Sequence, residues 1–176
     1  MGLGRRAFLA ATAGVPLLFS GRAHGQEIPE HNRASLTEPP PRPGPGDLVT
    51  RMPILFDAIV RGEPARADEL FLSREAFRLV KAVTNPDPLW ERLHHAYEAD
   101  ILRLHASLPA TASFERFRFT RRRGWVAVGE EANRLPYWAQ RHSFIDYRAG
   151  AAQHIEVRTM ITWGDRWFIT HLSEFH

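Results

Sequence analysis

The 176-residue sequence contains no cysteine and only one lysine, Lys81. Without cysteine there can be no disulfide, no thiolate nucleophile and no metal or iron–sulfur site held by thiolates. The lipidated cysteine that anchors exported lipoproteins is excluded for the same reason. Nearly all the positive charge is therefore carried by arginine, which does not deprotonate in proteins.

Long apolar runs are also scarce, and the one near the N-terminus is too short for a permanent membrane span. It follows two arginines, ends near Ser20, and is followed by Ala23 and Gly25 at positions −3 and −1 of a cut before Gln26. A charged segment, a short apolar segment and a small-residue site are typical of a removable export signal, which we predict at 1–25. This segment resembles the twin-arginine pattern of bacterial signals through Arg5, Arg6, Phe8 and Leu9.

Removal of this signal changes the charge balance of the chain. The whole sequence has 23 Lys+Arg and 20 Asp+Glu, and Arg5, Arg6 and Arg22 leave with the signal, so both totals become 20. A formally neutral chain gives no general case for nucleic-acid binding. We expect an exported protein, periplasmic or extracellular, with the twin-arginine export machinery as a partner and no membrane span in the mature form.

Proline dominates the next segment, 26–46, which holds six prolines and almost no apolar residue. Such a composition cannot bury enough surface to offset chain entropy, so it predicts an extended or disordered linker. The folded part is then a single domain at 47–176.

The first half of this domain has helical periodicity. Apolar residues recur at spacings of three and four over 48–60, which predicts a helix that is stopped by Gly62 and has Pro53 in its first turn. Pro64 opens a second short segment, and Ser73 can cap a third. A fourth, long helix is predicted after the sequence Asn85-Pro86-Asp87-Pro88, with an apolar stripe from Trp90 to Leu108.

After Leu108 the period changes to two, which is typical of strands. Gly164-Asp165 separates the last two strands and predicts a two-residue hairpin turn. Strict alternation then directs Ile161 and Phe168 toward the helices and leaves Met160, Trp167 and Ile169 on a mixed outer face. The predicted strands are 114–119 with one irregularity, 125–128, 137–147, 155–163 and 166–175.

Helices followed by four to five antiparallel strands predict an α+β fold. The sequence Ile59-Val60-Arg61-Gly62-Glu63-Pro64-Ala65 and the closing hairpin from Gly164 to His171 resemble the nuclear transport factor 2-like superfamily, also called the cystatin-like cone. This resemblance covers 47–176 and implies a curved sheet that closes with the helices into a cone-shaped pocket. The ketosteroid-isomerase type of site in that fold needs a tyrosine that the first helix here lacks.

Several side chains could line such a pocket. Alternation puts Trp138, Gln140, His142, Phe144 and Asp146 on one face of strand 137–147, and the sequence does not settle whether that face points inward. His142 with Asp146 could act as a base and its orienting carboxylate, and Glu174 is a second candidate acid. We predict no metal site and no cofactor. The predicted ligand-pocket residues are Trp90, His94, Tyr97, Trp138, His142 and Phe144.

Three functions remain open because fold alone does not select among them. The favoured hypothesis is a non-catalytic domain that binds a small apolar ligand in an aromatic-lined pocket. The second is an isomerase, dehydratase or cyclase that uses His142 or a nearby carboxylate. The third is an interaction module, either a homodimer or a domain docked to an envelope partner through the sheet face around Met160, Trp167 and Ile169.

Overall fold

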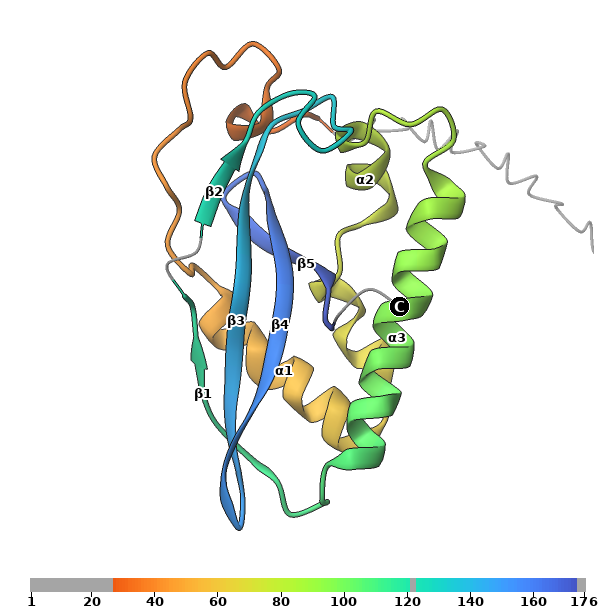
Figure 1. The fold of residues 1–176 in the computed structure, drawn as a ribbon, viewed down its shortest axis with the longest axis vertical. Helices are drawn as coiled ribbons and strands as arrows, with labels where there is room; N and C mark the ends of the chain where they lie inside the picture. Colours follow the sequence, from red (N-terminus) through yellow and green to blue (C-terminus); the bar gives the residue numbers. More distant parts are fainter. Residues whose placement is uncertain (1–26, 121–122, 174–176) are drawn as a thin grey trace, which may run out of the picture.

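The structure, a computed structural model, describes residues 27–120 and 123–173, with the side chain of Arg123 left out. Within this part the chain is α+β, with helices followed by a five-stranded antiparallel sheet, which confirms the predicted class (Figure 1). The helical elements are η1 (Glu30–Asn32), α1 (Leu48–Arg61), η2 (Pro64–Leu70), α2 (Arg74–Val80) and α3 (Asp87–Ser107). The strands are β1 (Ser113–Arg118), β2 (Arg123–Val126), β3 (Tyr137–Ala149), β4 (Ala151–Trp163) and β5 (Arg166–His171).

The predicted helix boundaries hold in most cases, because local side chains set them. Gly62 ends α1 in the left-handed conformation, at φ 67°, and the Ser73 hydroxyl caps α2 by accepting a hydrogen bond from the amide of Ala76 at 3.2 Å. Pro53 was predicted in the first turn of α1, and this is wrong. The helix begins at Leu48, so Pro53 lies inside it, where its ring removes one helical hydrogen bond.

The sheet has the order β1-β3-β4-β5, and β2 pairs with β3 beyond the end of β1. β3 and β4 form a hairpin of two 13-residue strands that turn at Gly150, where φ is 78°. β4 therefore begins four residues earlier than predicted, at Ala151. The turn at Gly164-Asp165 is confirmed, with Trp163 opposite Arg166.

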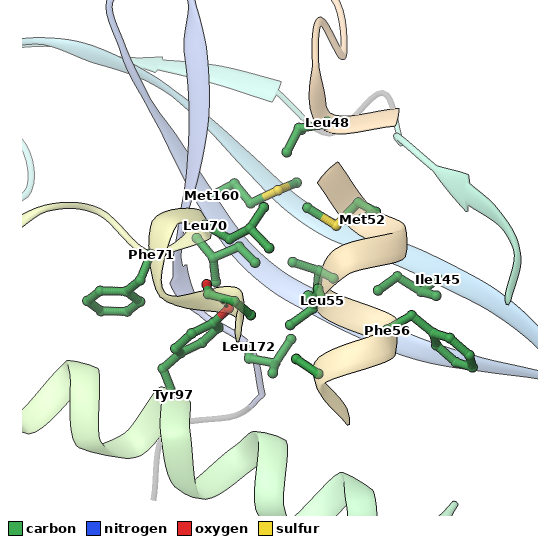
Figure 2. Close-up of a cluster of buried hydrophobic side chains, with 14 of the residues drawn as sticks. Leu48, Met52, Leu55, Phe56, Leu70, Phe71, Tyr97, Ile145, Met160 and Leu172 are labelled. Carbon is green, nitrogen blue, oxygen red and sulfur yellow. Dashed lines mark hydrogen bonds between the residues drawn. The ribbon is translucent and has the colours of Figure 1, made fainter. Parts of the chain in front are cut away.

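The main core lies between α1, η2, α3 and the sheet. Leu55, Ile59 and Ile101 are fully buried there, and Figure 2 shows Tyr97 of α3 reaching toward η2 while Leu55 and Met52 extend from α1. A second cluster packs α2 against Tyr137, Ile161 and Trp163 of the sheet. The sheet is thus covered on both sides near the Gly164 turn.

The alternation predicted beside the Gly164 turn holds, but the face opposite Ile161 and Phe168 is not an outer face. Ile161 and Phe168 lie on the side of the second cluster with α2, as predicted, whereas Met160, Trp167 and Ile169 are fully buried in the main core. Farther from the turn the alternation is interrupted: the β4–β5 register shifts between Thr159 and Met160, so Val157 lies in the main core with Met160, and His142 on β3 has a φ of +56°. Alternation from the turn cannot detect such irregularities. The outer face on which the interaction module was based is therefore not available at these residues.

The proline-rich segment is packed against the domain, which corrects the expected disordered linker for residues 27–46. Asn32 is fully buried; its side chain donates to the carbonyl oxygens of Pro136 at 2.8 Å and Thr162 at 3.3 Å and accepts from the amide of Gly164 at 2.7 Å. We call residues 27–46 the strap; its path is drawn in orange in Figure 1. It supplies polar contacts instead of apolar ones, which composition does not reveal.

Over the described residues, none of the helices combines the length and apolar character needed to cross a membrane. The predicted signal, with Arg5, Arg6, Phe8 and Leu9, and the candidate acid Glu174 lie outside the described residues.

Candidate functional site

Three of the predicted pocket residues lie together on α3. Trp90 stacks on His94 with ring centroids 4.6 Å apart, and its indole N–H donates to the carbonyl of Leu72 at 2.7 Å. His94 Nε2 contacts Asp68 at 2.6 Å. The Tyr97 hydroxyl donates to the carbonyl of Ala67 at 3.0 Å, and burial raises the pKa of this phenol. These bonds fix the helix against η2, so the polar tips of the side chains serve packing.

His142, Phe144 and Asp146 do not join this group. His142 Nδ1 hydrogen-bonds Glu156, whereas Asp146 accepts from Arg116 at 2.8 Å and from Arg118 at 2.8 and 2.9 Å. The hydrogen bond from Arg118 is the largest cause that lowers the pKa of Asp146. The carboxylate that orients His142 is thus Glu156, and the predicted pairing with Asp146 is wrong.

Trp138 is separate from both of these groups and lies beside β2 and the strap. Its ring meets Trp125 edge-on at 5.6 Å, and the Arg42 guanidinium of the strap stands 5.2 Å from the ring centroid. The Arg118 guanidinium lies over the Phe144 ring, 4.7 Å from its centroid. The six predicted pocket residues are therefore divided among separate surroundings, and no single cavity is lined by all of them.

An unpredicted hollow lies where α3 passes the end of β5, and we call it the α3–β5 crevice. It has a volume of about 420 Å³ and a mostly apolar lining. Figure 1 shows α3 beside the end of β5 at this place. The crevice is lined by Arg92, Leu93, Ala96, Tyr97, Ala99, Asp100, Arg103, Thr170, His171, Leu172 and Ser173.

The polar groups of this crevice come from both α3 and the end of β5. Asp100 is mostly buried and accepts hydrogen bonds from the Ser173 amide at 3.0 Å, the Ser173 hydroxyl at 2.6 Å and Arg103 at 2.5 Å. Burial, followed by the charges of Lys81 and Arg158, lowers the pKa of His171 from 6.5 to about 4. This pKa favours a neutral imidazole at pH 7, and Nδ1 of the ring contacts the Thr170 hydroxyl at 3.1 Å.

A smaller hollow of about 290 Å³, the outer cavity, adjoins the same histidine. Its walls are almost entirely polar: Glu131, Arg141, His142, Arg158, Thr159 and His171. Arg141 pairs with Glu131 at 2.6 Å, and Arg158 lies 3.8 Å from Glu156. The positive φ of His142 lies beside this cavity, in a conformation that is uncommon for a non-glycine residue and is enriched at functional sites.

Metal chemistry finds no support in the described ranges, where no group of three or more His, Cys, Asp or Glu residues is placed to hold an ion.

No protein family, no curated protein and no solved structure matches this chain. Its function must therefore be inferred from the residues and cavities themselves.

The sequence contained only a partial signal for the crevice. Leu93 and Tyr97 belong to the apolar stripe of α3, but Ala96 and Asp100 lie on its border, where small and acidic residues are common on any solvated helix face. The crevice forms because β5 ends beside α3, a long-range arrangement that helical periodicity does not encode.

Proposed function

We propose that this domain binds a small, largely apolar molecule in the α3–β5 crevice. The observation that carries the proposal is a mostly apolar hollow of about 420 Å³ that presents a neutral histidine. Small-molecule sites are typically hollows of about 300–1,000 Å³ with few polar groups that fix orientation. Of the pocket residues expected from sequence, only Tyr97 lines this crevice.

We further propose that the domain belongs to the nuclear transport factor 2-like superfamily and acts after export. The order of helices followed by an antiparallel sheet supports the first point, and the Arg5-Arg6 segment supports the second. A change of Arg5 and Arg6 to Lys should leave the precursor inside the cell. Secretion of that variant at the normal rate would contradict the twin-arginine assignment.

The binding proposal is tested by native mass spectrometry of the mature protein, with mild denaturation to release a bound molecule. Ala96→Phe places a ring at the wall of the crevice, and the matched control Ala106→Phe makes the same change at an exposed site on the same helix that does not line the crevice. We expect a released small molecule from the wild type and the control but not from Ala96→Phe. Equal retention by all three proteins would contradict a site in the crevice.

A second candidate function is catalysis by His171. A neutral imidazole beside an apolar crevice is suited to proton transfer, and Asp100 supplies a carboxylate in the same crevice. His142 was the base expected from sequence, but Glu156 already engages it. In a screen of isomerase and dehydratase substrates, His171→Gln should abolish any turnover and retain the bound molecule. Undiminished turnover in this variant would exclude His171 as the base.

A further inference from the structure

His171 lines two cavities of opposite chemistry. On one side lies the α3–β5 crevice with Leu93, Tyr97 and Leu172 in its walls. On the other side lies the outer cavity with Arg141, Arg158 and Thr159. In the sheet, Thr159 is the partner of both Arg141 and His171, so these three residues form one row across β3, β4 and β5. An apolar crevice and an arginine-lined cavity therefore share one lining residue.

The charges around this junction favour an anion. Lys81, Arg158, Asp100 and Glu131 act on the His171 ring, and each of the two cations acts more strongly than either carboxylate. The net potential at the ring is thus positive, which is one reason why the pKa of His171 is low. Lys81 follows α2, Arg158 is on β4, Asp100 is on α3 and Glu131 precedes β3, so these charges come from four different parts of the chain.

We propose that the ligand of this domain is an acidic amphiphile, with its apolar body in the α3–β5 crevice and its acidic head group in the outer cavity beside Arg158 and Arg141. This inference rests on the proposed binding function and adds the class of ligand. The ring of His171 lies at the boundary between body and head. A carboxylate, sulfate or phosphate would each meet the same donors.

The arginines have the capacity to receive such a head group. A guanidinium carries five N–H donors in a planar fork that matches an oxyanion. Arg158 lies 3.8 Å from Glu156, and Thr159 adds a hydroxyl to the wall of the same cavity. An ammonium head group would be repelled by the positive potential, so the site should bind an anionic amphiphile in preference to a cationic one.

The test compares decanoate with decanol, which share an apolar chain and differ in the head group. Binding to the mature protein is measured by calorimetry for the wild type, Arg158→Gln and the matched control Arg148→Gln. Arg148 is an exposed arginine on β3, paired with Glu115, that lines neither cavity. We expect decanoate to bind at least tenfold more tightly than decanol, in line with a charge-assisted hydrogen bond, and Arg158→Gln alone to remove this preference.

A second readout follows the His171 ring by NMR. A carboxylate bound beside it stabilises the imidazolium, so decanoate should raise the pKa of His171 and decanol should not. Equal affinities for the two probes, or a preference that survives Arg158→Gln, would overturn the acidic head group but leave apolar binding in place. Binding of neither probe would contradict the proposed function itself, and with it this inference.

Discussion

The α1 side of the sheet and the α3–β5 crevice are both apolar, but only one of them is filled. On the α1 side, Leu55, Ile59 and Met160 have no exposed surface, and the strap closes the end of this core through Asn32 and through the Gly44 carbonyl, which accepts from the Trp167 indole at 2.8 Å. At the crevice, α3 passes β5 and leaves about 420 Å³ open. The same kinds of side chain therefore contribute packing in one place and a binding surface in the other.

The largest expected effect comes from a substitution in the filled core on the α1 side of the sheet. Leu55→Ala should lower the free energy of unfolding by about 3–5 kcal/mol, because it removes buried methyl groups and leaves a cavity that a close-packed core cannot refill. Chemical denaturation measures this change. A loss below about 1 kcal/mol would mean that this region is as loosely packed as the crevice.

The next effect concerns the closure of that core by the strap. Asn32→Ala should lower stability by about 2 kcal/mol, because the Pro136 and Thr162 carbonyls and the Gly164 amide lose a buried partner. Thermal or urea unfolding gives the value. The control Asn85→Ala alters an exposed asparagine before α3 and should change stability by less than about 0.5 kcal/mol. Equal effects of the two variants would show that the strap is not part of the folded unit.

The crevice wall should show a pH dependence. Because the pKa of His171 is lowered from 6.5 to about 4 by burial and nearby cations, the unfolded chain takes up a proton at a higher pH than the native state does. The stability that His171 contributes is therefore complete above pH 6.5 and is lost as pH falls toward 4.

With allowance for solvent screening of a partly exposed ring, this difference between wild type and His171→Gln amounts to about 1–2 kcal/mol. Urea titrations of both proteins between neutral and acidic pH measure it. Parallel curves for the two proteins would show that the ring is solvated and that the crevice wall is more open than the structure describes.

The contrast between the two regions also separates what sequence could predict from what it could not. Gly62, Ser73 and the Gly164-Asp165 turn were correctly assigned because their chemistry acts on neighbouring residues. The strap was mispredicted because one buried asparagine, with partners more than 100 residues away, outweighs a composition typical of disorder.

The location of the candidate site depended on backbone irregularities and on contacts between elements that are far apart in the sequence. A positive φ at His142 and a register shift in β4–β5 interrupt the alternation along the strands. Met160 and Trp167 are buried because the main core with α1 covers the face that was predicted to be outer. The crevice arises from the passage of α3 beside the end of β5. Periodicity predicts which face of an element is apolar, but it does not predict whether the neighbouring element fills that face.

The smallest effect tests that distinction directly. Leu93→Ala makes in the crevice wall the same change as Leu55→Ala makes in the core, but Leu93 is half-buried and borders a hollow that already exists. The substitution loses only the free energy gained by removing the buried part of the leucine side chain from water. The expected decrease in the free energy of unfolding is therefore about 1 kcal/mol. The decrease should become larger when a ligand fills the crevice, because the ligand stabilises the wild type more than the variant. Unfolding of both proteins with and without decanoate measures the two quantities, and a loss as large as that of Leu55→Ala without ligand would mean that the crevice is closed in solution.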